Sequence, residues 1–232
     1  MNALAAALKN AGIEREQLDK IISTGYGRIS ATYATKTVTE ITCHAKGANF
    51  LYPSVRTIVD MGGQDCKAIR VDEDGHVEDF AMNDKCAAGT GRFFEVMSGV
   101  FKVPLAELGE LSLKSDQKAA ISSTCTVFAE SETISLLARG VKPENIQAGI
   151  HYSIANRIAG LFARVGIVSD VYFSGGVAKN KGMKKAIEDV LSVNIIEPNK
   201  LDPQLTGALG AAVLAQALGA RKEEVRELAN AA

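Results

Sequence analysis

Two apolar, strand-like runs that each end in a pair of glycines restrict the fold of this chain more than any other feature. Thr57–Asp60 leads into Gly62-Gly63, and Val171–Ser174 leads into Gly175-Gly176. A residue without Cβ lets backbone N–H groups approach an anion closely and also adopts positive φ. Each turn is therefore a candidate phosphate or nucleoside contact, and an ordinary tight turn at a strand end is the alternative.

Strand-like and helical segments alternate along the whole chain. Strands are expected at residues 21–23, 57–60, 67–71, 77–82, 119–122, 171–174 and 193–196, and helices at 1–20, 38–50, 93–101, 105–111, 127–138, 143–165, 179–191 and 207–218. Asp74-Gly75 between two apolar runs is typical of a β-hairpin. This alternation with one antiparallel hairpin predicts an α/β fold whose mixed sheet is flanked by helices.

Size and charge exclude several classes of protein. The chain has 232 residues, which suffice for one large domain or two small lobes. Its formal net charge of −1 gives no electrostatic case for binding nucleic acid or an anionic membrane. No run approaches the roughly 18 apolar residues of a membrane span, and residues 1–10 lack a signal peptide's basic region. Four scattered cysteines indicate a reducing compartment, the cytoplasm.

The turns themselves suggest some chemistries and exclude others. Asp60 stands just before the first glycine pair, where a carboxylate could hold Mg²⁺ through water. The second pair precedes an expected helix, and a helix N-terminus is a natural anion site. The chain has no G-x-x-x-x-G-K-[ST] pattern, which excludes a P-loop, and the segment 86–91 lacks the context of a dinucleotide-binding fingerprint.

Two cysteines, Cys86 and Cys125, stand near expected helix starts. A helix N-terminus favours the thiolate, which is the form that binds iron. Two ligands are two short of a four-iron cluster, but a twofold dimer would bring four together. The alternative is that both are buried, reduced cysteines, and we assign Cys43 and Cys66 to that alternative.

Seven segments carry a resemblance to a known family. In chain order they are residues 24–28, 40–45, 60–65, 82–93, 121–132, 174–178 and 206–211. Together they resemble the activator component of 2-hydroxyglutaryl-CoA dehydratase and the related ATPase subunits of benzoyl-CoA reductases. The two cysteine segments are long and specific, and the set spans almost the whole chain.

The resemblance implies an actin-like ATPase fold of the sugar-kinase and Hsp70 type, a homodimer, and one [4Fe–4S] cluster per dimer with Cys86 and Cys125 as its ligands. It implies ATP and Mg²⁺ as further cofactors. A 2-hydroxyacyl-CoA dehydratase or related reductase would be the partner, and a ferredoxin or flavodoxin the electron source. Carried over residue by residue, the catalytic positions are Asp60 and Gln64, and the nucleotide-binding positions are Gly62, Gly63, Gly175, Gly176, Val177 and Gly207.

One part of the family pattern is not found. The family begins with a β-hairpin bearing an Asp-x-Gly-Ser-type phosphate loop, and no such loop stands upstream of Gly25. We therefore expect an N-terminally incomplete first lobe over residues 1–55 and a second lobe over residues 56–232. We also expect weak or absent nucleotide hydrolysis with cluster binding retained.

Two other functions stay open from the residues alone. A small-molecule kinase or phosphohydrolase of the same fold would use the glycine turns but would need no thiolates. A non-hydrolysing cluster-binding subunit would need no nucleotide. Among the remaining polar residues, His44 and His151 are expected to be packed or capping residues, and Glu40 and Asp65 are possible water-positioning groups without a unique role.

Overall fold

The computed structural model describes residues 2–83, 89–121 and 126–230. Cys86 and Cys125, the predicted cluster ligands, lie outside the described residues. The strands are β1 (Ile22–Ser23), β2 (Lys36–Thr37), β3 (Thr57–Met61), β4 (Cys66–Val71), β5 (Val77–Asn83) and β6 (Val171–Ser174). The helices are α1 (Asn2–Ala11), α2 (Glu40–Leu51), α3 (Gly91–Phe101), α4 (Leu108–Leu113), α5 (Thr126–Ala138), α6 (Pro143–Val165), α7 (Lys181–Leu191) and α8 (Thr206–Asn230). Short 3₁₀ helices cover Arg15–Gln17, Arg28–Ser30, Leu105–Glu107, Gly176–Lys179 and Pro203–Leu205.

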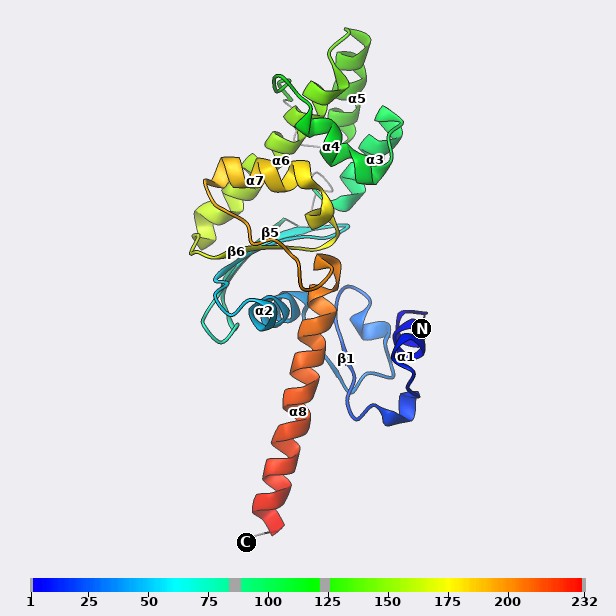
Figure 1. Ribbon diagram of the computed structural model, residues 1–232, viewed down its shortest axis with the longest axis vertical. Helices are drawn as coiled ribbons and strands as arrows, with labels where there is room; N and C mark the ends of the chain where they lie inside the picture. The colour runs from blue at the N-terminus through cyan, green and yellow to red at the C-terminus, as the bar shows by residue number, and fades with distance from the viewer. Residues whose placement is uncertain (1, 84–88, 122–125, 231–232) are drawn as a thin grey trace.

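A four-stranded sheet in the order β5-β4-β3-β6 forms the centre of the molecule. β3 pairs with β4 and β4 with β5 in antiparallel fashion, whereas β3 and β6 run parallel. Helices α6 and α7 cover one face and α2 the other, while α8 extends away from the sheet (Figure 1). The predicted α/β class, an actin-like fold with a mixed sheet and flanking helices, is confirmed.

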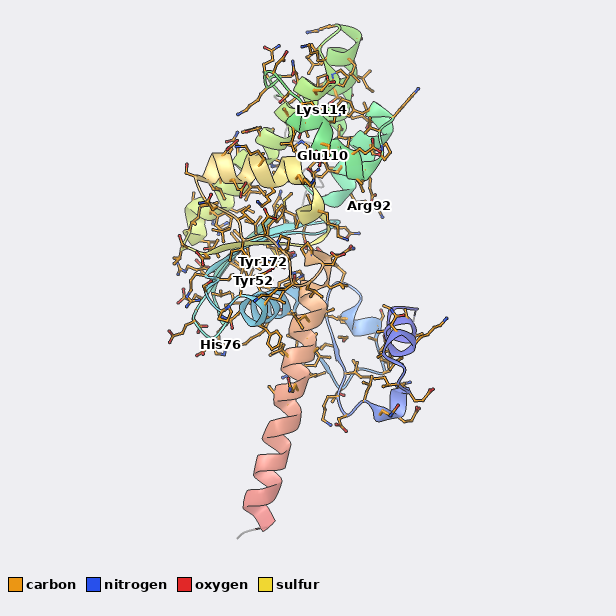
Figure 2. The ribbon with its side chains drawn as sticks, in the orientation of Figure 1. Tyr52, His76, Arg92, Glu110, Lys114 and Tyr172 are labelled. Atoms are coloured by element: carbon orange, nitrogen blue, oxygen red, sulfur yellow. The ribbon has the colours of Figure 1, made fainter. Side chains whose placement is uncertain are left out.

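Helices on both faces explain why the central strands are apolar on both sides. Val59 and Met61 join the cluster under α6 and α7, whereas Ile58 joins the cluster under α2. Tyr52 and Tyr172 lie side by side on the α2 face (Figure 2), with ring centroids 5.5 Å apart. A one-residue slip of a strand would exchange these two sets of side chains, so the burial fixes the register.

Helices α2 and α8 cross at very close range because glycines stand at the contact. A Cβ at Gly47 would lie 2.1 Å from the carbonyl oxygen of Thr206, and one at Gly210 would lie 1.8 Å from that of Cys43. Helix α8, from the predicted second lobe, thus packs on α2, from the predicted first lobe. The division at residue 55 stays a prediction.

Two predicted strands are wrong in the described residues. Ala119 donates its N–H to the carbonyl oxygen of Asn145 at 2.9 Å, so residues 119–121 lie along α6 and join no sheet. Residues 193–196 form only one bridge, between Ile195 and Val171. The N–H groups of Val193 and Ile195 donate to the carbonyl and side-chain oxygens of Glu188 at 3.1 and 3.0 Å, so they are not available to a sheet.

Candidate functional site

The two glycine turns meet at one edge of the sheet and line a single cavity of about 690 Å³. β3 and β6 are parallel neighbours with Asp60 opposite Ser174, so both strands end at the same edge. Gly175 has a φ of +89°, and a Cβ there would lie 2.3 Å from the carbonyl oxygen of Met61. Only glycine allows the two turns to approach this closely.

The first turn is also tied to the start of α3. Gly62 donates its N–H to the carbonyl oxygen of Asp65 at 3.0 Å, which closes the turn. The carbonyl oxygens of Gly62 and Gly63 accept the N–H groups of Gly91 and Arg92 at 2.9 and 3.0 Å. A movement of this turn would therefore be passed directly to the first residues of α3.

Asp60 is buried, with 3 % of its surface exposed, and three side chains position it. The Ser174 hydroxyl donates to Asp60 Oδ1 at 3.0 Å, and His44 Nδ1 lies 3.0 Å from Ser174 Oγ and 3.4 Å from Asp60 Oδ1. Because the Ser174 proton is directed at Asp60, its oxygen accepts from His44, so His44 carries a proton on Nδ1. The second oxygen of Asp60, Oδ2, lies 3.4 Å from Lys67 Nζ.

A buried ammonium connects the remaining charged groups. Lys67 Nζ lies 2.6 Å from Asp65 Oδ1 and 3.9 Å from Glu40 Oε1. Burial by itself lowers the pKa of Lys67, but the surrounding carboxylates outweigh it and raise that pKa above its ordinary value. Tyr26, 63 % exposed, donates its hydroxyl to Asp65 Oδ2 at 2.8 Å, and this hydrogen bond raises the tyrosine pKa.

Apolar groups and an amide also line the cavity, together with the charged side chains of Glu95 and Lys179. Phe94, Leu105 and Val177 supply apolar surface there, and Asn180 supplies an amide. Asn180 Oδ1 accepts the Met183 N–H at 2.9 Å and so caps α7. The apolar side chains suit a flat, uncharged group, whereas the carboxylates around Asp60 suit a cation with phosphate oxygens.

His151, on α6, contacts the side chain of Asn180, which lines the cavity. Its Nε2 lies 3.1 Å from Asn180 Oδ1, and its Nδ1 lies 2.7 Å from the carbonyl oxygen of Gln147. Burial lowers the pKa of His151 to about 4, and its contacts with the two oxygens only partly oppose that shift. The imidazole is therefore neutral at pH 7, and its single N–H donates to only one of these two oxygens. Its burial agrees with the packed role expected for it.

Most residues predicted for the site come together in this cavity. The cavity is lined by Asp60, Gly62, Gly63, Gln64, Gly175, Gly176 and Val177 from the predicted set. Gly207 does not line it, and a Cβ there would lie 2.8 Å from His44 Nε2. Nucleotide contact by these residues, and catalysis by Asp60 and Gln64, stay predictions.

Sequence reasoning missed several residues of the cavity wall. His44 has a polar role at Asp60 beyond the packing or capping expected for it. Lys67 and Gln204 were not expected in the site at all. Tyr26 falls within a segment of the resemblance, residues 24–28, which was the one signal that marked it.

A second group of potential metal ligands lies outside the cavity. In the part of the chain that the structure describes, Asp72, Asp74 and His76 form the one such cluster of three. They occupy the exposed turn between β4 and β5, at the end of the sheet near α2 (Figure 2). Asp72 Oδ1 accepts the N–H groups of Asp74 and His76, so the cluster closes this turn.

Comparison with known proteins identifies the family. The model of the BadF/BadG/BcrA/BcrD ATPase family matches residues 1–215. The chain belongs to this family. Because its members are ATPases, the family is consistent with a cavity lined by both carboxylates and apolar side chains.

Three relatives are similar over most of their length. The activator of lactoyl-CoA dehydratase from Anaerotignum propionicum is 51% identical over 221 residues, covering 95% of this chain and 84% of the relative. The activator of 2-hydroxyisocaproyl-CoA dehydratase from Clostridium difficile, solved with bound ADPNP, is 47% identical with a TM-score of 0.89 and coverage of 95% and 82%. Component A of (R)-2-hydroxyglutaryl-CoA dehydratase from Acidaminococcus fermentans is 48% identical with a TM-score of 0.90 and coverage of 94% and 84%. These likenesses confirm the resemblance seen in the sequence.

The residues of the cavity fit a magnesium nucleotide. Glu40, Asp60, Asp65 and Glu95 contribute four carboxylates to its lining, against two cationic side chains, Lys67 and Lys179. An anionic phosphate chain would be repelled by this wall unless a divalent cation came with it.

Of the helices that the structure describes, none combines the length and the apolar character needed to cross a membrane.

Proposed function

We propose that this chain is an ATP-dependent electron donor that activates a 2-hydroxyacyl-CoA dehydratase. The observation that carries the proposal is the single cavity in which both glycine turns meet beside Asp60. It occurs in a member of an ATPase family whose similar proteins are named as dehydratase activators or components. A reductase partner of the benzoyl-CoA type is the second candidate.

In the nucleotide half of the proposal, Asp60 holds Mg²⁺ through water and Gln64 orients the attacking water. The N–H groups of Gly63 and Gly176 would face the phosphates, and Val177 would lie against the adenosine. Asp60 suits its role because its Oδ1 is already fixed by Ser174, whereas Oδ2 has only the longer contact to Lys67. Mg²⁺ prefers such a combination of carboxylate, water and phosphate oxygens.

In the electron-transfer half, Cys86 and Cys125 of two subunits together hold one [4Fe–4S] cluster. Cys125 directly precedes the first residue of α5, Thr126, and Cys86 stands five positions before Gly91, where α3 begins. Both cysteines thus stand close in sequence to helix N-termini, whose positive dipole ends favour thiolates. The cluster would accept an electron from a ferredoxin or flavodoxin and pass it to the dehydratase.

The link between the two halves would run through the first glycine turn. Gly62 and Gly63 contact the proposed phosphates on one side and accept the N–H groups of Gly91 and Arg92 on the other. A change from ATP to ADP would shift the turn and with it the start of α3. For a one-electron transfer, about 59 mV changes the equilibrium constant tenfold, so a small displacement near the cluster has a large effect.

The nucleotide half is tested by measuring ATP hydrolysis and nucleotide affinity of the anaerobically purified protein. Asp60→Asn is expected to abolish most turnover, and the matched control Asp72→Asn, in the exposed β4–β5 turn, is expected to keep the wild-type rate. Equal rates in the wild type and Asp60→Asn would refute the assignment of Asp60.

The cluster half is tested by iron, sulfide and absorbance measurements against dimer concentration. We expect about four irons per dimer, lost in Cys86→Ser and in Cys125→Ser. Cys66→Ala is the matched control, because Cys66 is buried and burial raises its pKa to about 11. About four irons in each subunit would refute a bridging cluster, and a colourless protein with full ATP turnover would favour a kinase or phosphohydrolase.

The choice of partner is tested by mixing the reduced protein and ATP with purified acyl-CoA enzymes. A 2-hydroxyacyl-CoA dehydratase is expected to gain activity that depends on ATP, whereas a benzoyl-CoA-type reductase is expected to gain none. The opposite result would assign the chain to a reductase.

A further inference from the structure

Gly207, in the first turn of α8, is buried, and it is the one predicted nucleotide-binding residue that does not line the cavity. A Cβ at this position would meet the imidazole of His44 before any other group. It would lie 2.8 Å from Nε2, 3.0 Å from Cδ2 and 3.5 Å from Cε1. The missing side chain of Gly207 therefore makes room for the ring of His44.

His44 connects this glycine to Asp60. The Nε2 side of the imidazole faces Gly207, whereas Nδ1 lies 3.0 Å from Ser174 Oγ and 3.4 Å from Asp60 Oδ1. The Ser174 hydroxyl in turn donates to the same oxygen of Asp60 at 3.0 Å. Because an imidazole ring is planar and rigid, a displacement of its Nε2 side also changes the position of Nδ1.

The start of α8 is held at this short distance from α2 (Figure 1). A Cβ at Gly47, on α2, would lie 2.1 Å from the carbonyl oxygen of Thr206. The Thr206 hydroxyl donates to the carbonyl oxygen of Pro203 at 2.9 Å and accepts from the buried Tyr172 hydroxyl at 3.1 Å. A movement of α8 away from α2 would open the helix contact and break the bond to Tyr172. A methyl group at position 207 would therefore displace the imidazole and not the helix.

We propose that Gly207 and His44 together position Asp60, so that Gly207 acts on the nucleotide site through His44 and not by contact with the nucleotide. The glycine leaves space for the imidazole, and the imidazole holds Ser174 and the Oδ1 atom of Asp60 in place. Oδ2, with only the longer contact to Lys67 at 3.4 Å, is then the oxygen left for a hydrated cation. The consequence for Mg²⁺ rests on the proposed function, whereas the contact between Gly207 and His44 does not.

The test is a double-mutant cycle of Gly207→Ala and His44→Ala in the intact, anaerobically purified protein. The measured quantities are the Mg²⁺ concentration for half-maximal ATP hydrolysis and, without nucleotide, the denaturant midpoint of unfolding. Each single variant is expected to raise that Mg²⁺ concentration about tenfold, and the double variant to raise it no further, because both changes remove one shared contact. An increase of about a hundredfold in the double variant would show independent effects and would overturn the proposal.

His44→Asn is the conservative variant, because its amide keeps an N–H donor near the position of Nδ1 and leaves the space beside Gly207 empty. It is expected to recover most of the Mg²⁺ dependence that His44→Ala loses. Alanine normally stabilises a helix relative to glycine. Gly207→Ala should therefore lower the unfolding midpoint in the wild type, through the clash, but should not lower it in His44→Asn. An equal loss of stability in both backgrounds would overturn the proposal.

Gly210→Ala is the matched control, three residues further along α8. Its Cβ would strike the backbone of Cys43 and Gly47 and no side chain, so its loss of stability should be the same in the wild type and in His44→Asn. If Gly207→Ala does not fold in the wild type, recovery of folding in His44→Asn supports the proposal, and failure in both backgrounds refutes it.

The two measurements separate this proposal from the proposed function. If Gly207→Ala folds, hydrolyses ATP and keeps the Mg²⁺ dependence of the wild type, the role of Gly207 is structural only and the proposal is overturned. If the wild type itself hydrolyses no ATP, that result counts against the proposed function alone. The unfolding midpoints, which require no nucleotide, then decide whether Gly207 acts through His44.

Discussion

The two glycine turns have nearly the same local sequence pattern and meet at one edge of the sheet, but they lead into different elements. The first, Gly62-Gly63, turns back into the antiparallel strand β4 and lies among carboxylates around a buried lysine. The second, Gly175-Gly176, passes through a 3₁₀ helix into α7; Gly175 lies next to Met61 and Asp60, and the helix leads to Asn180, which contacts His151. The element that each turn enters decides which side chains reach the turn, and therefore which part of a ligand the turn suits.

The turns also differ in how tightly glycine is required. A Cβ at Gly63 would meet nothing within 4 Å, whereas a Cβ at Gly175 would strike the backbone of Met61. Gly175 therefore holds the two strands together, and Gly63 is free to face a ligand. Close backbone contact therefore requires glycine at position 175, whereas position 63 has space for a Cβ.

The largest expected effect comes from this difference. Gly175→Ala should lower the free energy of unfolding by about 3 kcal/mol or more, because it combines a positive φ with a backbone clash. Gly63→Ala should change that free energy by less than about 1 kcal/mol. Denaturant unfolding of both variants measures the contrast. Equal losses would show that the two turns are held alike.

The second prediction concerns the stability of the folded protein in acid, which depends on His151 beside Asn180. The pKa of His151 is lowered to about 4 in the folded protein, so the unfolded chain binds the proton first as pH falls below about 6.5. The folded protein should therefore lose up to about 3 kcal/mol of stability between pH 6.5 and pH 4, and no more from this group at lower pH.

His151→Gln checks this, because the amide keeps hydrogen-bonding capacity and does not titrate. Unfolding free energies of the wild type and the variant should differ by a constant amount above pH 7.5, and the difference should shift in favour of the variant toward pH 4. A difference that stays constant from pH 8 to pH 4 would contradict the shifted pKa of His151.

Chemistry at the charged turn gives the next prediction. Asp60→Asn keeps the shape of the side chain and its contact with Ser174 but removes the charge that would hold Mg²⁺. ATP hydrolysis should fall about a hundredfold, equivalent to about 2.7 kcal/mol of transition-state stabilisation. Steady-state kinetics at several Mg²⁺ concentrations measures it, with Asp72→Asn as the control. A loss that saturating Mg²⁺ fully restores would place Asp60 in ion binding alone.

The neighbourhood of the glycine turns was predictable from sequence because it depends on local signals. Apolar runs of four residues ending in glycine pairs indicate buried parallel strands, and the strand ends of such a sheet meet at one edge. The pattern of residues marked each turn as a candidate phosphate or nucleoside contact, and the family resemblance assigned Asp60 and Gly175 to one site. The hairpin at Asp74-Gly75 was predictable from its turn residues in the same way.

The charged cluster could not be predicted because it depends on tertiary contacts. Tyr26, Glu40 and Lys67 come from three separate segments, and no local spacing relates them. A lysine two residues after Asp65 suggests an exposed position in an antiparallel strand, and only the α2 layer buries it. The short apolar runs at residues 119–121 and 193–196 had strand-like composition, but their N–H groups bond to α6 and α7 instead of a sheet.

The smallest expected effect concerns Asn180, where substitutions can separate a contribution to stability from a contribution to nucleotide binding. Asn180→Ala removes the cap of α7 and the partner of His151, which should cost about 1 kcal/mol of stability and reduce nucleotide affinity about fivefold. Asn180→Ser is the matched variant, because serine also caps a helix but is too short to reach the cavity. It should recover most of the stability while its nucleotide affinity, measured by calorimetry, stays low. If both properties recover together, Asn180 acts on the nucleotide only by holding α7 in place, and the neutral turn would then be structural throughout.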